Sequence, residues 1–220
     1  MRLTRDFEIA QHETTQAEWV AAGFVNQSVT SGFENTDCAQ PDCPVGNVTW
    51  FDALNFANRL SELHQPAYPA CYNLEGCAGA PGDGFACTSV QTTSPTAYEC
   101  TGCRLPTDAE WEHAARAGTT TSVYSGDLLD HPLGACHPDP NLERIAWFCA
   151  NAGHTSHPVG LPEPNGWGLY DMIGNTDKWT SDSYTGLGHD RDAGEAPGGT
   201  VTATFEDFGY QCHRAATPLK

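Results

Sequence analysis

The sequence has 220 residues, of which 39% are hydrophobic and 17% charged, with 22 glycines and 15 prolines. This length suits one domain with a real core, and the composition indicates a loop-rich globular protein rather than a helical bundle or a disordered chain. Acidic residues outnumber basic ones 28 to 10, which gives a formal net charge of −18. Such a surface repels phosphate backbones and anionic lipid, so we expect neither nucleic acid nor bare membrane as a partner.

Ten cysteines are the strongest compositional signal. The cytosol keeps thiols reduced, whereas an oxidising compartment pairs them, so we expect a disulfide framework whose connectivity the irregular spacing leaves open. No run of about 18 apolar residues is long enough to span a bilayer, and the first residues lack the apolar segment of a signal peptide. We therefore expect a secreted or cell-envelope protein without a transmembrane segment, whose leader is not present in this chain.

The predicted elements begin with a strand over residues 3–10. Three capping boxes follow, in which a threonine and an acidic residue three positions later satisfy each other's free N–H groups. They place helix starts at Thr15, Thr49 and Thr107. Apolar residues at helical spacing support the second helix, and Gly118 is well placed to end the third.

The remaining segments are richer in turn residues. Residues 71–103 are read as a Cys-rich surface insertion that disulfides fix as a loop, and residues 124–164 as loop with one apolar island. Strand and turn signals lie at 166–172 and 175–179, and a short strand is predicted after Gly198. Two or three modest helices in a loop-dominated strand framework predict an α+β fold.

Four segments, read in order, resemble the formylglycine-generating enzyme (sulfatase-modifying factor) family. They are FEIAQHETTQAEW at 7–19, PVGNVTWFDA at 44–53, RLPTDAEWEHAARAG at 104–118 and PNGWGLYDMIGN at 164–175. The resemblance implies one domain over residues 1–220 with the loop-rich, C-type-lectin-like fold of that family. In that fold we expect few short helices, a small mixed or antiparallel sheet, disulfides and calcium in structural sites, with residues 178–220 as a divergent C-terminal region.

The tail departs from the family at its cysteines. The family's oxidase converts a cysteine of sulfatase-like substrates into formylglycine with O₂ and copper(I), and the resemblance implies that two nearby C-terminal cysteines hold the copper. Two thiolates suit this soft ion, and one alone holds it weakly. Here only Cys212 follows the GGT at 198–200. Cys103 or Cys149 could approach it in space, with a disulfide as the ordinary outcome, so Cys212 is catalytic and copper is a cofactor only under an oxidase alternative.

A second departure concerns calcium. The family usually reads GNVWEW where this chain has GNTDKW at 174–179. The resemblance assigns the acidic position to a calcium site, and Lys178 puts a cation there, which would repel Ca²⁺. The candidate metal ligands that remain are Asn175, Asp177, whose side chain would point elsewhere in an extended segment, and Asn151, which lies where the family can bind another calcium.

Other features are given ordinary interpretations. The closing GFR strand of the family is missing, which would leave the opening strand unpaired unless another segment closes the sheet. His154 and His157 are interpreted as solvated or structural rather than as half a zinc site, and an acidic turn at 190–195 as a solvated loop. We expect four tryptophans to lie in the core. They are Trp50, Trp111, Trp147 and Trp167.

The leading hypothesis is an extracellular or envelope binding module on this fold, without oxidase activity, for an unknown protein, peptide or glycan. Its expected surface is the divergent region from about 178 to 214, because recognition is usually placed on loops held by a rigid scaffold. The candidate ligand-binding residues are Trp179, Thr200, His213 and Arg214. The alternatives are the copper-dependent oxidase that makes formylglycine in sulfatases, and a retroelement-diversified ligand-display protein, since such proteins also use this fold.

Overall fold

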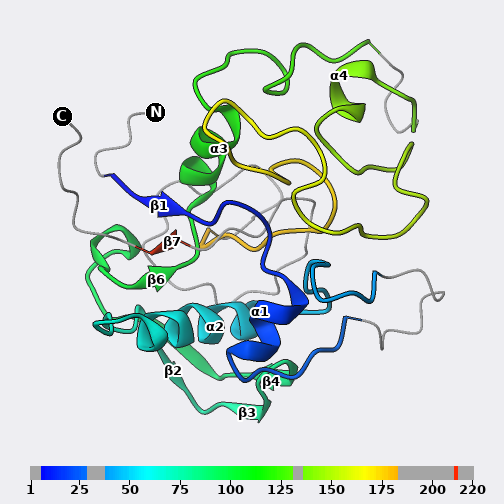
Figure 1. Ribbon diagram of the computed structural model, residues 1–220. Coiled ribbons are helices and arrows are strands. Elements are labelled where there is room, and N and C mark those ends of the chain that lie inside the picture. Colours follow the sequence, from blue (N-terminus) through cyan, green and yellow to red (C-terminus); the bar gives the residue numbers. More distant parts are fainter. Residues whose placement is uncertain (1–5, 29–37, 131–135, 183–210, 213–220) are drawn as a thin grey trace.

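The protein is described from a computed structural model over residues 6–28, 38–130, 136–182 and 211–212. Figure 1 shows α1 (Gln16–Ala21) and α2 (Trp50–Leu63) at one end of the molecule, together with short strands. The other end holds α3 (Asp108–Arg116), α4 (Pro140–Glu143) and long loops. A small three-stranded sheet lies between the two ends. This architecture confirms the loop-rich α+β fold predicted from the sequence.

Each of the three predicted helices begins at its capping box. The N-cap threonine hydroxyl accepts a hydrogen bond from the N–H three residues on, and the acidic side chain there accepts one from the threonine N–H. The pairs are Thr15 with Glu18, Thr49 with Asp52, and Thr107 with Glu110. At the end of α3 the left-handed residue is Ala117, with φ 46°, and Gly118 follows it with φ 86°.

A buried ion pair ties the start of α3 to the strand before it. The Arg104 guanidinium donates to both carboxylate oxygens of Glu110, over 2.9 and 2.8 Å. Burial alone would raise the pKa of Glu110, but the hydrogen bonds and charge of Arg104, together with Thr107, outweigh it and hold that pKa below its usual value. The same carboxylate is therefore both a helix cap and one half of a bidentate pair.

The three-stranded sheet has the order β1-β7-β6 and is antiparallel throughout. Its strands are β1 (Glu8–Ile9), β6 (Cys103–Arg104) and β7 (Gln211–Cys212). Of the alternatives that the sequence left open, the structure shows that another segment closes the sheet, because β7 pairs with the opening strand. A segment of the tail that shows no GFR pattern thus closes this part of the sheet.

Residues 71–103 form two antiparallel hairpins, which corrects the prediction of a plain loop. One joins β2 (Tyr72–Glu75) to β5 (Ser89–Thr92), and the other joins β3 (Ala78–Ala80) to β4 (Asp83–Ala86). The connection between β5 and β6 includes the 3₁₀ helix η1 (Ala97–Glu99). The expected disulfides are present, between Cys71 and Cys100 and between Cys77 and Cys87. Tyr72, Leu74 and Val90 of the β2–β5 pair pack in or against the core, and β2 alternates apolar with polar residues, but only over four positions. The strands β3 and β4 are mostly exposed.

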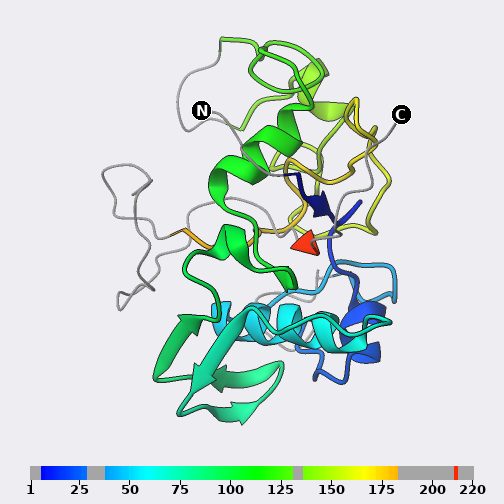
Figure 2. The same ribbon diagram turned by 90° about the vertical axis from the view of Figure 1, so that its left-hand side faces the viewer.

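Helix α2 lies between the hairpins and the three-stranded sheet, as Figures 1 and 2 both show. Its Asp52 caps the helix and also accepts a 2.7 Å hydrogen bond from the N–H of Gly82, in the turn between β3 and β4. A side chain at Gly82 would collide with the backbone of Val25, since a Cβ there would lie 2.1 Å from that residue's carbonyl oxygen. The hairpin therefore docks closely against the α1–α2 end.

Two apolar clusters make the core. At the α1–α2 end, the rings of Trp19, Phe24 and Phe56 pack together, with centroids 4.6 to 5.4 Å apart. The second cluster joins the buried face of α3 to the loop that follows residue 164, through Trp111, Ala114, Ala115, Leu169 and Met172.

The four tryptophans expected in the core do not share one environment. Trp111 is buried, Trp50 and Trp147 are half-buried, and Trp167 is 52% exposed. The core assignment is therefore wrong for Trp167, whose ring meets His113 edge-on with centroids 5.0 Å apart. The sequence motif around Trp167 does not indicate which of its residues face outward.

Between residues 119 and 182 the only helix that the structure describes is the four-residue α4. Of the strand and turn signals at 166–172 and 175–179, only the turns are formed, and the rest of these residues make irregular loop. One isolated bridge pairs Trp147 with Gly174. Polar side chains fix the path of the chain in this region.

Candidate functional site

The loop at residues 171–178 meets the segment before α1 through a buried ion pair. The Lys178 ammonium lies 2.5 Å from Oε1 of Glu13, and each side chain is only 2% exposed. The same ammonium donates to the carbonyl oxygen of Gly174 over 2.7 Å. Two segments that are 165 residues apart in the sequence are therefore joined by one buried cation.

Further donors converge on the Glu13 carboxylate. Asn175 donates to its Oε2 over 2.6 Å, and Thr176 donates to Oε1 from its backbone N–H at 3.1 Å and its hydroxyl at 3.0 Å. The amide oxygen of Asn175 is also engaged, because it accepts the N–H of His157 at 2.8 Å. Glu13 is thus held by a fixed set of donors in addition to the ammonium.

This loop has its shape because three of its residues are left-handed. Asp171, Gly174 and Asn175 have φ of 54°, 73° and 66°, a region that favours glycine and, among other residues, asparagine and aspartate. A Cβ at Gly174 would lie 2.1 Å from the carbonyl oxygen of Trp147, so a side chain is excluded there. The DMIGN segment of the sequence therefore supplies the residue types that its backbone requires.

Asp171 is a second buried carboxylate beside the pair. Its Oδ2 accepts the N–H of Gly160 at 2.7 Å, while Oδ1 has no hydrogen-bond partner among the described residues. Burial raises the pKa of Asp171, and the Gly160 N–H and the charge of Lys178 offset only part of that effect. Burial likewise raises the pKa of Glu13, against the opposing charge of Lys178. Two carboxylates therefore share the field of one ammonium.

Two of the residues proposed as metal ligands, Asn151 and Asn175, make other hydrogen bonds, and the third, Asp177, is exposed. The amide oxygen of Asn151 accepts the N–H of Phe148 at 2.8 Å, and its amide nitrogen donates to Ala146. The side chain of Asp177 is exposed, on the opposite side of the chain from buried Lys178. In the described ranges, no group of three or more His, Cys, Asp or Glu side chains could hold a metal ion. With an ammonium at its centre, the arrangement around Glu13 does not fit a calcium ion.

The cysteines are oxidised where the structure describes them. Disulfides join Cys38 to Cys43 and Cys136 to Cys149, in addition to the two in the hairpin region, and no cysteine of the described residues is free. Of the two cysteines expected to approach Cys212, Cys149 is therefore already bonded to another residue.

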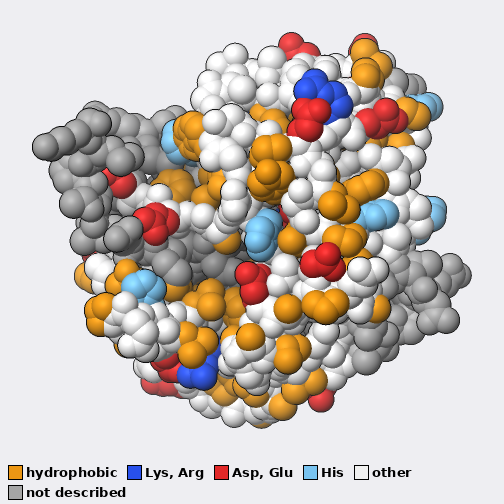
Figure 3. Space-filling model, viewed as in Figure 1, with side chains coloured by type: hydrophobic (Ala, Val, Ile, Leu, Met, Phe, Trp, Pro, Cys, Tyr) orange, Lys and Arg blue, Asp and Glu red, His pale blue; other side chains and the backbone are white. Residues whose placement is uncertain are grey.

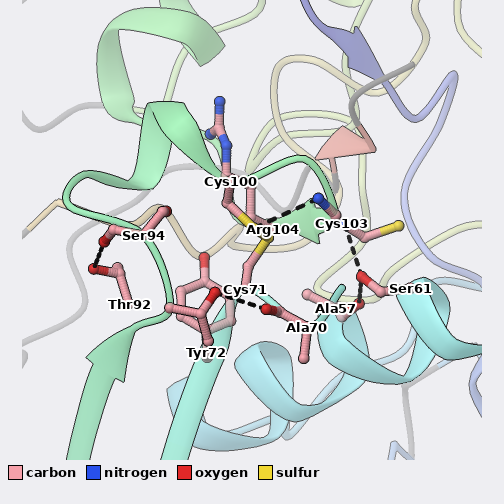
Figure 4. The surroundings of a disulfide bond; sticks show 12 residues. Ala57, Ser61, Ala70, Cys71, Tyr72, Thr92, Ser94, Cys100, Cys103 and Arg104 are labelled. Carbon is pink, nitrogen blue, oxygen red and sulfur yellow. Dashed lines mark hydrogen bonds between the residues drawn. A yellow bond between two sulfur atoms is a disulfide. The ribbon is translucent and has the colours of Figure 1, made fainter. Parts of the chain in front are cut away.

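The other one, Cys103, lies directly across the sheet from Cys212 in the β6–β7 register. Its backbone N–H is fixed by the hydroxyl of Ser61 at 2.8 Å, and its sulfur is itself disulfide-bonded. Figure 4 shows that this sulfur points away from the neighbouring Cys71–Cys100 bond.

The candidate ligand-binding residues fall mostly outside the described residues, namely Thr200, His213 and Arg214, as does the acidic turn at 190–195. Trp179 is described, and it packs against the α1–α2 core while its indole N–H donates to the carbonyl of Val48 at 2.9 Å. The ring of His157 stacks on Trp147 with centroids 3.9 Å apart. Both aromatic side chains therefore help to hold the scaffold.

Sequence reasoning missed Glu13 and Asp171, although both stand in the segments that carry the family resemblance. A charged residue is rarely fully buried without a partner, so each needed a partner distant in sequence that no local pattern names. On the face seen in Figure 3, acidic side chains are spread among apolar and neutral ones and basic side chains are few, in keeping with the net charge of −18.

Comparison with known proteins identifies relatives over most of the chain. The chaperone protein LppX of Paenibacillus barcinonensis is 29% identical over 79% of this chain and 61% of its own length. The formylglycine-generating enzyme of Bos taurus is 27% identical over 90% of this chain and 49% of its own length. The chain thus spans about half to three-fifths of the length of these curated relatives.

Two solved structures share the fold. Treponema denticola variable protein 1 superposes with a TM-score of 0.55 at 27% identity, over 79% of this chain and 61% of that one. CarF gives 0.54 at 26% identity, over 81% and 69%. The family model described as a sulfatase-modifying factor enzyme 1-like domain matches residues 1–215. The chain belongs to the formylglycine-generating enzyme family, that of the sulfatase-modifying factor domain.

Proposed function

We propose that this domain is a non-catalytic binding module that works outside the reducing cytoplasm. The observation that carries the proposal is the position of Cys212, the last cysteine of the chain. In the strand register it faces Cys103, whose sulfur is already oxidised. The family resemblance implies that a copper(I) oxidase needs two nearby thiolates in the tail. The tail of this chain contains one cysteine.

The spacing of paired residues in the sheet supports the proposal that the domain is non-catalytic. Residues directly opposite each other in an antiparallel pair have Cα atoms about 4.5–5.5 Å apart, which lies within the range that a disulfide spans. A sulfur in a disulfide carries no thiolate and is a poor ligand for a soft metal ion. The position of Cys212 therefore favours a structural link over a metal site.

The names of several relatives point to roles other than oxidation. One of the relatives that cover most of the chain is called a chaperone protein, and one of the solved structures is called a variable protein. A mouse relative, 36% identical over 40% of this chain, is called an inactive formylglycine-generating enzyme. The ligand proposed for this module is a protein, peptide or glycan, and the disulfides favour a secreted or envelope location.

In the described part of the chain, none of the helices is both long and apolar enough to cross a membrane. The proposed binding surface remains the region from 178 to 214, of which residues 183–210 and 213–214 lie outside the described residues. At the start of that region Lys178 and Trp179 are anchored to Glu13 and Val48.

A second candidate function is ligand display by a diversified protein. The similarity to Treponema denticola variable protein 1 favours it, because that protein's name states that it varies. Sequencing the source genome for near-identical copies tests it. Copies that differ only after residue 175 support display, and a single copy, or copies that differ throughout, contradict it.

A turnover assay tests the main proposal. The purified protein is incubated with copper(I), O₂ and a C-x-P-x-R peptide, and mass spectrometry follows conversion of the thiol to the aldehyde. We expect no conversion, while the formylglycine-generating enzyme of Streptomyces coelicolor, a relative 40% identical over 44% of this chain, serves as the positive control. Conversion that disappears in a Cys212→Ser variant with an unchanged melting temperature would establish an oxidase instead.

A further inference from the structure

The cluster around Glu13 has the composition of a site for a hard cation. The carboxylate of Glu13 and the backbone carbonyl of Gly174 both contact the Lys178 ammonium, and the buried carboxylate of Asp171 lies in its electrostatic field. Carboxylate and carbonyl oxygens that converge from distant segments are the ligands that calcium takes in proteins. Here a side chain of the protein supplies the positive charge.

We infer that the Lys178 ammonium is a built-in substitute for a bound divalent cation, which makes the junction between the 171–178 loop and the segment before α1 independent of calcium. An ammonium has three hydrogen-bond donors and one positive charge, so it satisfies oxygen atoms from several directions as a small cation does. Because it is covalently attached, it occupies the position at any external calcium concentration.

The orientation of the surrounding polar groups fits an ammonium group that is always present. Both oxygens of Glu13 accept hydrogen bonds from the loop, and the amide oxygen of Asn175 is directed to the N–H of His157 rather than toward the centre of the cluster. In a metal site these oxygens would be turned toward the ion. The loop is therefore built around hydrogen-bond donors.

The cluster contains more carboxyl groups than cations. Glu13 and Asp171 are two buried carboxylates beside one ammonium, and Oδ1 of Asp171 has no hydrogen-bond partner among the described residues. A divalent ion would balance two carboxylates, whereas Lys178 balances one. Removal of the ammonium should consequently leave an oxygen-rich cavity that attracts a divalent cation.

The test compares melting temperatures in 2 mM calcium chloride and in EDTA for the wild type, Lys178→Gln and Lys178→Glu. We expect the wild-type melting temperature to differ by less than about 1 °C between the two conditions. Both variants should melt below the wild type in EDTA and regain stability with calcium. The gain should be larger for Lys178→Glu, roughly 5 °C or more when calcium exceeds its dissociation constant a hundredfold.

Arg144→Gln is the matched control, since it also removes one cation from an ion pair, the exposed one with Glu163, and it should show no calcium response. If Lys178→Glu does not fold, Lys178→Gln still decides the matter, because glutamine keeps a donor for Gly174. A wild type that gains as much from calcium as the variants would overturn the inference. So would a pair of folded variants that calcium does not stabilise.

Discussion

The α1–α2 end of the molecule and the loops between residues 119 and 182 are stabilised in different ways. At the α1–α2 end, capped helices bury an aromatic cluster, and most of the stabilisation comes from apolar area removed from water. In the loops, buried polar side chains bind backbone N–H and C=O groups that no helix or sheet satisfies. Asp139, for example, accepts hydrogen bonds from the N–H groups of Leu129, Asn141 and Leu142.

This difference shows how a chain with little regular structure can still have a single conformation. Every buried backbone polar group needs a partner, and side chains such as Asn165, Asp171 and Asn175 supply those partners one by one. Each such side chain satisfies one or a few backbone groups, whereas a strand satisfies them along its whole length. The loops should therefore be sensitive to single polar substitutions, and the α1–α2 end to loss of apolar volume.

The largest effect is expected from Phe56→Ala at the α1–α2 end. Phe56 is 1% exposed and packs against Trp19 and Phe24, so its removal leaves a cavity and should lower the free energy of unfolding by about 3–5 kcal/mol. Chemical denaturation monitored by circular dichroism measures the change. A loss below about 1 kcal/mol would show that the aromatic cluster does not dominate this end.

A smaller loss in the free energy of unfolding, about 2–3 kcal/mol, is expected from Asn165→Leu in the loops. Asn165 donates to the carbonyl of Ala114 and accepts the N–H groups of Trp167 and Leu169, and leucine of similar size leaves these buried groups unsatisfied. Hydrogen exchange should accelerate at residues 165–170 and stay unchanged in α2. Uniform acceleration over both regions would contradict the contrast between them.

The smallest effect is expected from Thr49→Ala, at the N-cap of α2. The hydroxyl accepts a hydrogen bond from the Asp52 N–H at 3.0 Å, and loss of such a cap lowers the free energy of unfolding by about 1 kcal/mol. Thermal melts of this variant and of Val20→Ala, an exposed helical control at 54% exposure, should separate the cap from ordinary surface change. Equal melting temperatures for the two variants would mean that the cap contributes little.

The sequence predicted the helices well and the loops poorly, for a physical reason. A capping box is a local pattern, because Thr49 and Asp52 are three residues apart, and all three boxes are formed. The hairpins at 71–103 were missed because their strands are only three or four residues long, and β3 and β4 are mostly exposed. At 166–172 and 175–179 the aromatic residues suit strands, but the left-handed Asp171 and Asn175 prevent an extended chain, so only the turn signals hold.

The candidate site was predicted only in part. The sequence indicated that Lys178 would disfavour calcium, but its partner Glu13 stands 165 residues earlier and no spacing rule connects them. Likewise, the sequence singled out Cys212 as the last cysteine, yet only the strand register brings it opposite Cys103. Long-range pairs of this kind are set by the fold rather than by any local pattern.

Disulfide mapping of the purified, unreduced protein tests the central claim most directly. Thiols are blocked under denaturing conditions, the protein is digested without reduction, and the peptides are identified by mass spectrometry. We predict no blocked thiol and a linked peptide pair that contains Cys103 and Cys212. A blocked, reactive thiol on Cys212 beside a second reduced cysteine would contradict the account, since that pair could hold a cuprous ion.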